Sequence, residues 1–139
     1  MRVILDTGPL VALVNRREAR HGWAREKVAA LRAPFLTCEA VVSEACFLLR
    51  NVVGGPATVM SLLVSGSVKA SFDLDEQAES VTALMRRYQS VPMSLADACL
   101  VRMAELYEES SLLTFDSDFT VYRKHLNQII PLIAPENLG

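Results

Sequence analysis

Four acidic residues stand at places in the chain where carboxylates can do chemistry. Asp6 follows the apolar residues 3–5, and Asp116 follows a second apolar run later in the chain. Asp97 falls in the first turn of one expected helix, and Glu44 falls in the middle of another, among apolar neighbours. Helix capping explains the other three acids one at a time, but it does not explain Glu44.

The chemistry that such acids predict depends on whether they meet. Two carboxylates about 5 Å apart repel by roughly 3 kcal/mol at an effective dielectric constant near 20. In a cluster of four carboxylates, retained protons or bound cations must therefore reduce this repulsion. Oxygen ligands without histidine or cysteine favour Mg²⁺ or Mn²⁺ over zinc. These ions activate a bound water and stabilise in-line displacement at phosphorus, so the pattern predicts phosphodiester hydrolysis.

The elements that would bring these acids together alternate along the chain. Expected strands cover residues 3–5, 33–37, 68–72, 111–115 and 129–133. Expected helices cover residues 8–15, 16–32, 38–53, 56–64, about 75–88 and 94–109, and a further short helix contains residues 122–124. Such alternation favours a mostly parallel sheet with helices on both faces. The strand ends and the following helix starts then lie on one edge, where Glu44 can also reach from the second helical turn.

Three local features give finer expectations. Thr37 precedes the helix over 38–53 and is predicted to cap it. That helix is apolar on most of its surface and is expected to be largely buried, which makes an unpaired charge at Glu44 costly. Two interpretations stay open for Glu44, a solvated polar strip shared with its neighbours or a contact with a metal or an arginine. Pro131 indicates an edge position for the last strand.

Length and composition indicate one ordered domain over residues 1–139, with 51% hydrophobic residues. The net charge of −2 argues against a protein whose main task is binding a long nucleic-acid duplex. Basic residues gather instead in residues 16–32, which include Arg16, Arg17 and Arg20. This segment is either a solvated helix face or the local patch that a polyanion such as RNA needs.

The cysteines and histidines do not predict a zinc site. Cys38, Cys46 and Cys99 form no CxxC pair, and His21 and His125 have no partner at ligand spacing. The three cysteines lie in apolar stretches and lack a disulfide framework, which favours reduced thiols and a cytoplasmic location. The chain opens directly on a strand rather than a signal peptide, and no uncharged apolar run approaches the ~20 residues of a membrane span.

Four short motifs occur in order along nearly the whole chain. They are Ile4-Leu5-Asp6-Thr7, Ser43-Glu44, Ala96-Asp97-Ala98 and Leu113-Thr114-Phe115-Asp116-Ser117-Asp118-Phe119. Together they resemble PIN-domain proteins, especially the ribonuclease toxins of VapC-type toxin–antitoxin pairs. Each motif alone occurs by chance, whereas the four in this order make a fairly specific signal.

The resemblance implies a three-layer α/β/α domain with a central, mostly parallel five-stranded sheet, and an Mg²⁺- or Mn²⁺-dependent endoribonuclease. The positions matching the family's catalytic and metal-binding acids are Asp6, Glu44, Asp97 and Asp116. Asp118 is an additional candidate ligand, and the hydroxyls of Thr7 and Thr114 are candidates for orienting water or carboxylates. The resemblance also implies a homodimer and a small antitoxin protein that holds the enzyme inactive.

Two other functions remain open from the sequence. One is a non-catalytic PIN-like binding domain, although the presence of all four acids argues against decay of the site. The other is a phosphatase of the HAD class, in which an aspartate after the first strand is the nucleophile. That class needs a second aspartate two residues later, and this chain has Gly8 there.

Overall fold

The structure, a computed structural model, describes residues 1–138. These residues contain a parallel sheet of five short strands. Its order is β3-β2-β1-β4-β7, and every neighbouring pair is parallel. The strands are β1 (Arg2–Leu5), β2 (Phe35–Thr37), β3 (Val68–Ala70), β4 (Ser110–Leu113) and β7 (Leu132–Ile133). The predicted α/β fold with a five-stranded parallel sheet is therefore confirmed.

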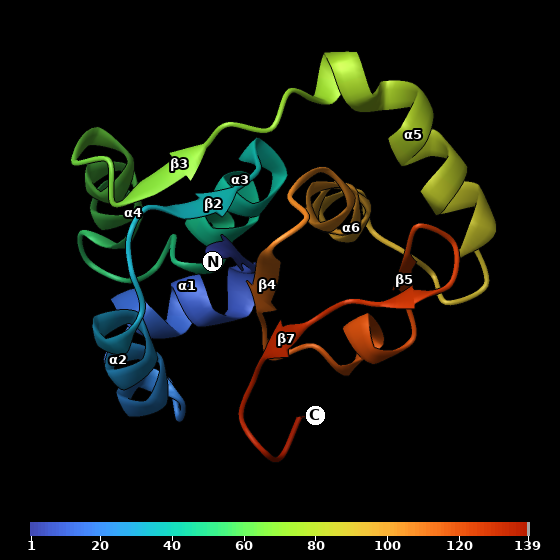
Figure 1. The fold of residues 1–139 in the computed structure, drawn as a ribbon. Coiled ribbons are helices and arrows are strands. Elements are labelled where there is room, and N and C mark those ends of the chain that lie inside the picture. Colours follow the sequence, from blue (N-terminus) through green and yellow to red (C-terminus); the bar gives the residue numbers. More distant parts are fainter. Residues whose placement is uncertain (139) are drawn as a thin grey trace.

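Helices connect the strands and cover the sheet. They are α1 (Thr7–Val14), α2 (His21–Ala30), α3 (Glu39–Leu48), α4 (Gly55–Val64), α5 (Leu74–Arg87) and α6 (Leu95–Leu106). Helix α1 contacts α2, α3 and α4, whereas α6 contacts α5, β1 and β4. Figure 1 shows α1 and α2 on one side of β4 and α6 and α5 on the other, which is the arrangement that right-handed crossovers between parallel strands produce.

The core lies where β1 and β4 meet α6. Val3, Ile4 and Leu5 of β1 are each at most 1% exposed, as expected for the central strand of a sheet covered on both faces. Helix α6 packs on these strands, and its residues 98–101 are also at most 1% exposed. Within residues 1–138, none of the helices has the length and apolar character needed to cross a lipid bilayer.

The single helix predicted over residues 16–32 is wrong at its start. Residues 16–20 form turns and bends, and α2 begins only at His21. The cause lies at Asn15, whose side-chain oxygen accepts a hydrogen bond from the backbone N–H of Arg17 (3.1 Å). Its carbonyl also accepts from the N–H of Glu18. Asparagine often ends a helix in this way, because its short side chain competes for backbone groups.

The C-terminal segment also differs from the prediction. Residues 123–124 form a strand, β5 (Arg123–Lys124), which pairs antiparallel with β6 (Gln128–Ile129), and the expected short helix is instead a 3₁₀ turn, η1 (Ser117–Thr120). The expected strand over 129–133 is divided into β6 and β7 around Pro131, because proline has no N–H to donate to a ladder. The predicted edge position is confirmed, since β7 is the last strand of the sheet.

Helix α3 is shorter and more exposed than expected. It ends at Leu48 rather than near residue 53, and only Val41 and Ala45 of the helix are buried. The capping role predicted for Thr37 is wrong, because its hydroxyl donates to the carbonyl of Leu5 (2.8 Å) and thus ties β2 to β1.

Candidate metal centre

The ends of β1 and β4 place two polar residues side by side. Leu5 pairs with Leu113 in register, so Asp6 and Thr114 follow on neighbouring parallel strands. The Thr114 hydroxyl donates to Oδ2 of Asp6 (2.6 Å), and the backbone N–H of Thr7 donates to Oδ1 (2.7 Å). Asp6 is also the N-cap of α1, so its capping position and its place at the sheet edge coincide.

The Thr114 hydroxyl links a second acid to the first. Its oxygen accepts a hydrogen bond from the backbone N–H of Asp116 (2.9 Å) while its proton is donated to Asp6. Asp116 in turn caps η1, where its Oδ1 accepts from the backbone N–H of Asp118 (2.9 Å). A fully buried hydroxyl therefore fixes the distance between the ends of β1 and β4.

Asp97 enters the site from the first turn of α6. The hydroxyl of Ser94 caps this helix by accepting from the N–H of Asp97 (3.0 Å). The carboxylate of Asp97 accepts a hydrogen bond from the phenol of Tyr122 (3.0 Å). Tyr122 is completely buried, and the sequence analysis missed this contact because it connects residues 25 positions apart through an element expected to be helical.

The structure brings all four predicted acids to one cavity of about 620 Å³, lined by Asp6, Glu44, Asp97 and Asp116. One carboxylate oxygen from each of Asp97, Asp116 and Asp118 lies within 4.8 Å of the others. In the part of the chain that the structure describes, this is the one group of three such side chains close enough to share an ion, and Asp6 and Glu44 are not members of it. Asp118 is thus nearer to the centre of the cluster than its secondary place in the prediction suggested.

Glu44 is exposed rather than buried, so the expected cost of burying its charge does not arise. It reaches the cavity from α3, and its Oε2 accepts a hydrogen bond from the hydroxyl of Thr7 (3.3 Å). The solvated interpretation of Glu44 is therefore confirmed, whereas its contact with a metal stays a prediction and no arginine forms a salt bridge with it within residues 1–138.

Burial and like charges control the protonation of the cluster. The pKa of Asp6 is raised from 3.8 to about 6, chiefly because the carboxyl is buried, while its hydrogen bonds from Thr114 and Thr7 oppose the increase. The charges of Asp97 and Asp116 raise it further. Burial likewise raises the pKa of Asp97, against the hydrogen bond from Tyr122. A cluster whose anionic form is this unfavourable favours a proton or a cation.

The donor set fits a hard divalent cation. Within residues 1–138, no lysine or arginine forms a salt bridge with Asp6, Glu44 or the 97/116/118 group. The groups facing one another are carboxylate oxygens, and cysteine and histidine are absent from the residues that line the cavity. Oxygen-only sites of this kind suit Mg²⁺ or Mn²⁺.

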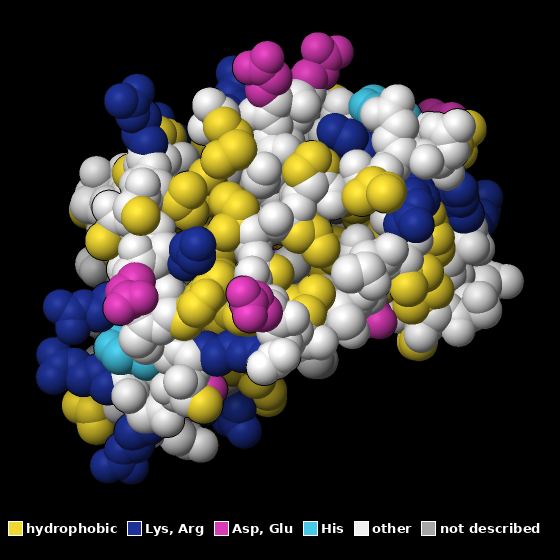
Figure 2. Space-filling view, turned by 60° about the horizontal axis from the view of Figure 1, so that its bottom comes forward, with side chains coloured by type: hydrophobic (Ala, Val, Ile, Leu, Met, Phe, Trp, Pro, Cys, Tyr) yellow, Lys and Arg dark blue, Asp and Glu magenta, His cyan; other side chains and the backbone are white. Residues whose placement is uncertain are grey.

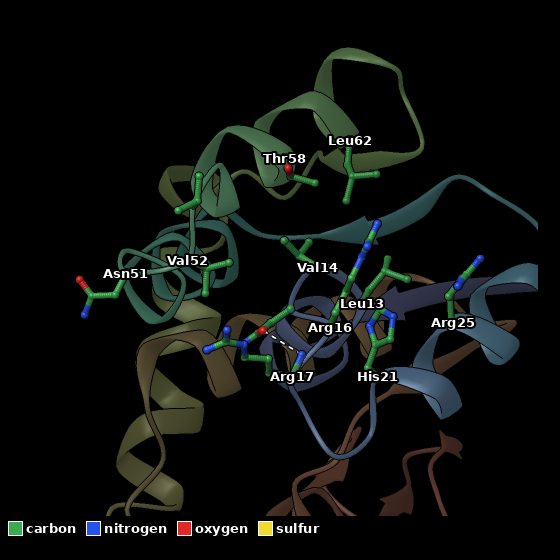
Figure 3. A pocket seen from close by; sticks show the side chains of 12 residues that line it. Leu13, Val14, Arg16, Arg17, His21, Arg25, Asn51, Val52, Thr58 and Leu62 are labelled. Atoms are coloured by element: carbon green, nitrogen blue, oxygen red, sulfur yellow. Dashed lines mark hydrogen bonds between the residues drawn. The ribbon is translucent and has the colours of Figure 1, made fainter.

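The arginines predicted to bind RNA do not share one place. Arg16 and Arg17 line a different cavity, of about 1070 Å³, together with Arg25 and His21 (Figure 3). Arg20 instead lies beside the acidic cavity, with its guanidinium 4.9 Å from the centre of the Phe115 ring.

Phe115 forms an aromatic wall of the acidic cavity that the sequence analysis did not single out. Trp23 packs edge-on against it with ring centres 5.5 Å apart. A Cβ at Gly8 would come within 3.1 Å of the Phe115 ring, so glycine permits the close approach of α1 to the segment after β4.

Replacing Thr114 with valine tests whether the shared hydroxyl organises the acids. We expect Thr114→Val to lower Mn²⁺ affinity about 10- to 100-fold, as is typical for groups that orient a metal ligand by a hydrogen bond without binding the metal themselves. It also leaves the Asp116 N–H without its acceptor, so the free energy of unfolding should fall by about 1–3 kcal/mol. The matched control is Thr37→Val, which removes another fully buried hydroxyl bonded to a carbonyl outside the cavity. Equal metal affinities in the two variants, measured by calorimetry, would contradict this role.

The fold and the site together define a class of protein. It is an α/β protein with a parallel sheet and an acidic, oxygen-only candidate centre at the carboxyl edge of that sheet. The fold is similar to the crystal structure of Mycobacterium tuberculosis VapC20, described as a sarcin–ricin loop cleaving toxin, with a TM-score of 0.76 and 21% identity over 93% of this chain and 99% of that one. Ribonuclease VapC26 of Mycobacterium tuberculosis is 25% identical over 132 residues, which are 94% of this chain and 93% of the relative. A family model of the PIN domain matches residues 3–124. The chain therefore belongs to the PIN-domain family.

Proposed function

We propose that this protein is an endoribonuclease dependent on Mg²⁺ or Mn²⁺, which hydrolyses RNA phosphodiester bonds as the toxin of a toxin–antitoxin pair. The observation behind this proposal is that four carboxylates from different elements line one cavity, and within residues 1–138 none of them has a basic partner. Membership of the PIN-domain family and similarity to a relative named as a ribonuclease support the same activity.

The residues proposed to hold the metal are Asp6, Glu44, Asp97 and Asp116, with Asp118 as a further ligand. Asp97, Asp116 and Asp118 already place carboxylate oxygens close enough to share one ion. A bound Mg²⁺ or Mn²⁺ supplies a water of lowered pKa and neutralises charge on the phosphoryl oxygens.

Other side chains position this cluster. Thr114 fixes Asp6 relative to Asp116, and Thr7 holds Glu44 at the cavity. Tyr122 orients Asp97 by a hydrogen bond to one oxygen, which leaves the other oxygen available to a ligand. These are positioning residues, since each acts through an acid rather than on RNA.

A small antitoxin, a homodimer and a cytoplasmic location complete the proposal, with residues 1–139 acting as one domain. Large apolar side chains on or just after α3 and α4 are exposed and support a protein partner at this surface. They are Phe47 (61% exposed), Leu48 (51%), Val53 (102%), Met60 (48%) and Val64 (88%).

Cleavage of an end-labelled structured RNA tests the activity directly. We expect cleavage products with about 5 mM Mg²⁺ or about 1 mM Mn²⁺, which are on the order of the concentrations at which weakly held ions bind. We expect no products in excess EDTA, and we expect activity to return when metal is added back. Cleavage that persists in EDTA would contradict the proposal. If calorimetry detects no binding of either ion at millimolar concentration, the non-catalytic binding domain becomes the better description.

A further inference from the structure

A second cavity, of about 1070 Å³, lies at the other end of α1 from the acids. Its walls come from the end of α1, the turn after it, α2, the segment after α3, and α4. Arg16, Arg17 and Arg25 line it together with His21, and Figure 3 shows these side chains around the end of α1. Among the described residues lining this cavity there is no aspartate or glutamate.

The arginines of this cavity have unused binding capacity. None of Arg16, Arg17 and Arg25 forms a salt bridge within residues 1–138, and all three are exposed. Each guanidinium offers five N–H donors in a fork that matches the oxygens of a phosphate. Figure 2 shows the wider setting, with Lys and Arg side chains and a histidine gathered at the end of the molecule where α2 lies.

One further polar group, the side-chain amide of Asn51, adds donors without adding negative charge. The ring of His21 is fixed in the wall of the cavity by a 2.7 Å contact between its Nδ1 and the carbonyl of Ala12. With an overall charge of −2, this local concentration of positive charge is not a property of the whole surface. Amides and arginines are typical contacts to nucleic acid backbones.

The spacing between the two cavities suits one strand of RNA. Nine residue steps along α1 separate Asp6 from Asn15, which at 1.5 Å per residue is about 13.5 Å. The Debye length at physiological ionic strength is about 8 Å, so the acids do not cancel the field of the arginines. At about 3.4 Å per nucleotide of a helical strand, the same distance corresponds to roughly four nucleotides.

We propose that the arginine cavity is a phosphate-binding anchor for RNA, in which Arg16, Arg17 and Arg25 hold the backbone about four nucleotides from the bond at the acidic cavity. This inference rests on the proposed function in that RNA is the substrate. The anchor binds phosphates without reading bases, so it contributes affinity and register rather than sequence preference. An acidic protein segment is the competing occupant and is an outcome of the test.

The test measures RNA binding in EDTA, where cleavage plays no part. Fluorescence anisotropy with a labelled ten-nucleotide RNA gives the binding constant over a range of KCl concentrations. For single strands, the slope of log K against log [KCl] becomes shallower by about 0.7 for each phosphate that the protein no longer neutralises. We expect a decrease of about 0.7 for Arg25→Gln and about 1.4 for the double variant Arg16→Gln/Arg25→Gln.

The matched control is Arg86→Gln, which removes an exposed helical arginine from α5, outside the cavity. Its slope should equal that of the wild-type protein. For the wild type, lengthening the RNA from two to eight nucleotides should steepen the slope of log K against log [KCl]. For the double variant, the same lengthening should steepen this slope only slightly. If the double variant unfolds in a thermal melt, the single variant Arg25→Gln decides the result.

Several results would overturn the anchor. They are an unchanged slope in the cavity variants, an equal decrease in Arg86→Gln, or no RNA binding by the wild type at low salt. Weaker binding to an acidic protein partner with an unchanged RNA slope would assign the cavity to that partner instead. Failure of the nuclease activity is a separate result, because a slope that becomes shallower in EDTA supports the anchor even if no RNA is cleaved with metal present.

Discussion

Replacing Asp97 with asparagine is expected to lower the rate of metal-dependent RNA cleavage by at least about a hundredfold, since a metal ligand contributes several kcal/mol to the transition state. Asparagine keeps the shape and can still accept the hydrogen bond from Tyr122, so the protein should remain folded. The reduced rate follows from removing one of three carboxylates that lie within 4.8 Å of one another. Initial rates at saturating Mn²⁺, together with a circular dichroism spectrum, measure this effect.

Two variants make this result specific. Asp75→Asn removes an exposed carboxylate of α5 outside the acidic cavity and should leave the rate unchanged. Tyr122→Phe removes only the hydrogen bond to Asp97 and should reduce the rate less than Asp97→Asn does. Activity of Asp97→Asn within a few-fold of the wild type would show that this acid is not a ligand of the proposed metal.

The second large effect concerns stability in the absence of metal. The pKa of Asp6 is about 6 in the folded protein and 3.8 when unperturbed, so the folded state binds this proton more tightly than the unfolded chain does. Stability from this group is therefore fully present below about pH 3.8 and disappears as the pH rises through about 6. A difference of about two pKa units corresponds to roughly 3 kcal/mol.

Asp6→Asn removes that titration. Between pH 4 and pH 7.5 in EDTA, we expect the free energy of unfolding of the variant, relative to the wild type, to change by about 2.4 kcal/mol in favour of the variant. Urea unfolding at the two pH values measures it, and Asp75→Asn should show no such change. Added Mn²⁺ should stabilise the wild type at pH 7.5 and the variant far less, because only binding to the folded state contributes. A pH-independent difference between variant and wild type would contradict the raised pKa.

The acids could be predicted because each belongs to a local pattern and the parallel topology makes the patterns converge. Residues 3–5 are apolar and β-branched in two of three places, and the proline at position 9 starts a helix, so the position of Asp6 at the sheet edge follows from neighbours in the sequence. The same reasoning places Asp97 and Asp116. Glu44 was placed correctly for a reason that proved wrong, since its helix is not largely buried.

The contacts that organise the acids could not be predicted from the sequence. The bond between Thr114 and Asp6 joins residues 108 positions apart and depends on the register between β1 and β4. The bond between Tyr122 and Asp97 depends on a chain path through η1 and β5, where the sequence indicated a helix. The turn at Asn15 was missed because the charged residues after it have good helix propensity, while a single side-chain contact decides the outcome.

The hydrogen bonds of Asp6 have a consequence for the size of ion that the site accepts. Each carboxylate oxygen already accepts one bond, from Thr7 or from Thr114, so the carboxylate cannot rotate without breaking one of them. Mg²⁺ forms bonds of about 2.0–2.1 Å in nearly ideal octahedral geometry, whereas Ca²⁺ takes about six to eight ligands at about 2.3–2.6 Å in flexible geometry. A carboxylate held on both oxygens suits the small, rigid coordination shell. We therefore expect Mn²⁺ or Mg²⁺ to bind more tightly than Ca²⁺ in calorimetry, because the backbone N–H of Thr7 and the Thr114 hydroxyl hold the Asp6 carboxylate in one orientation.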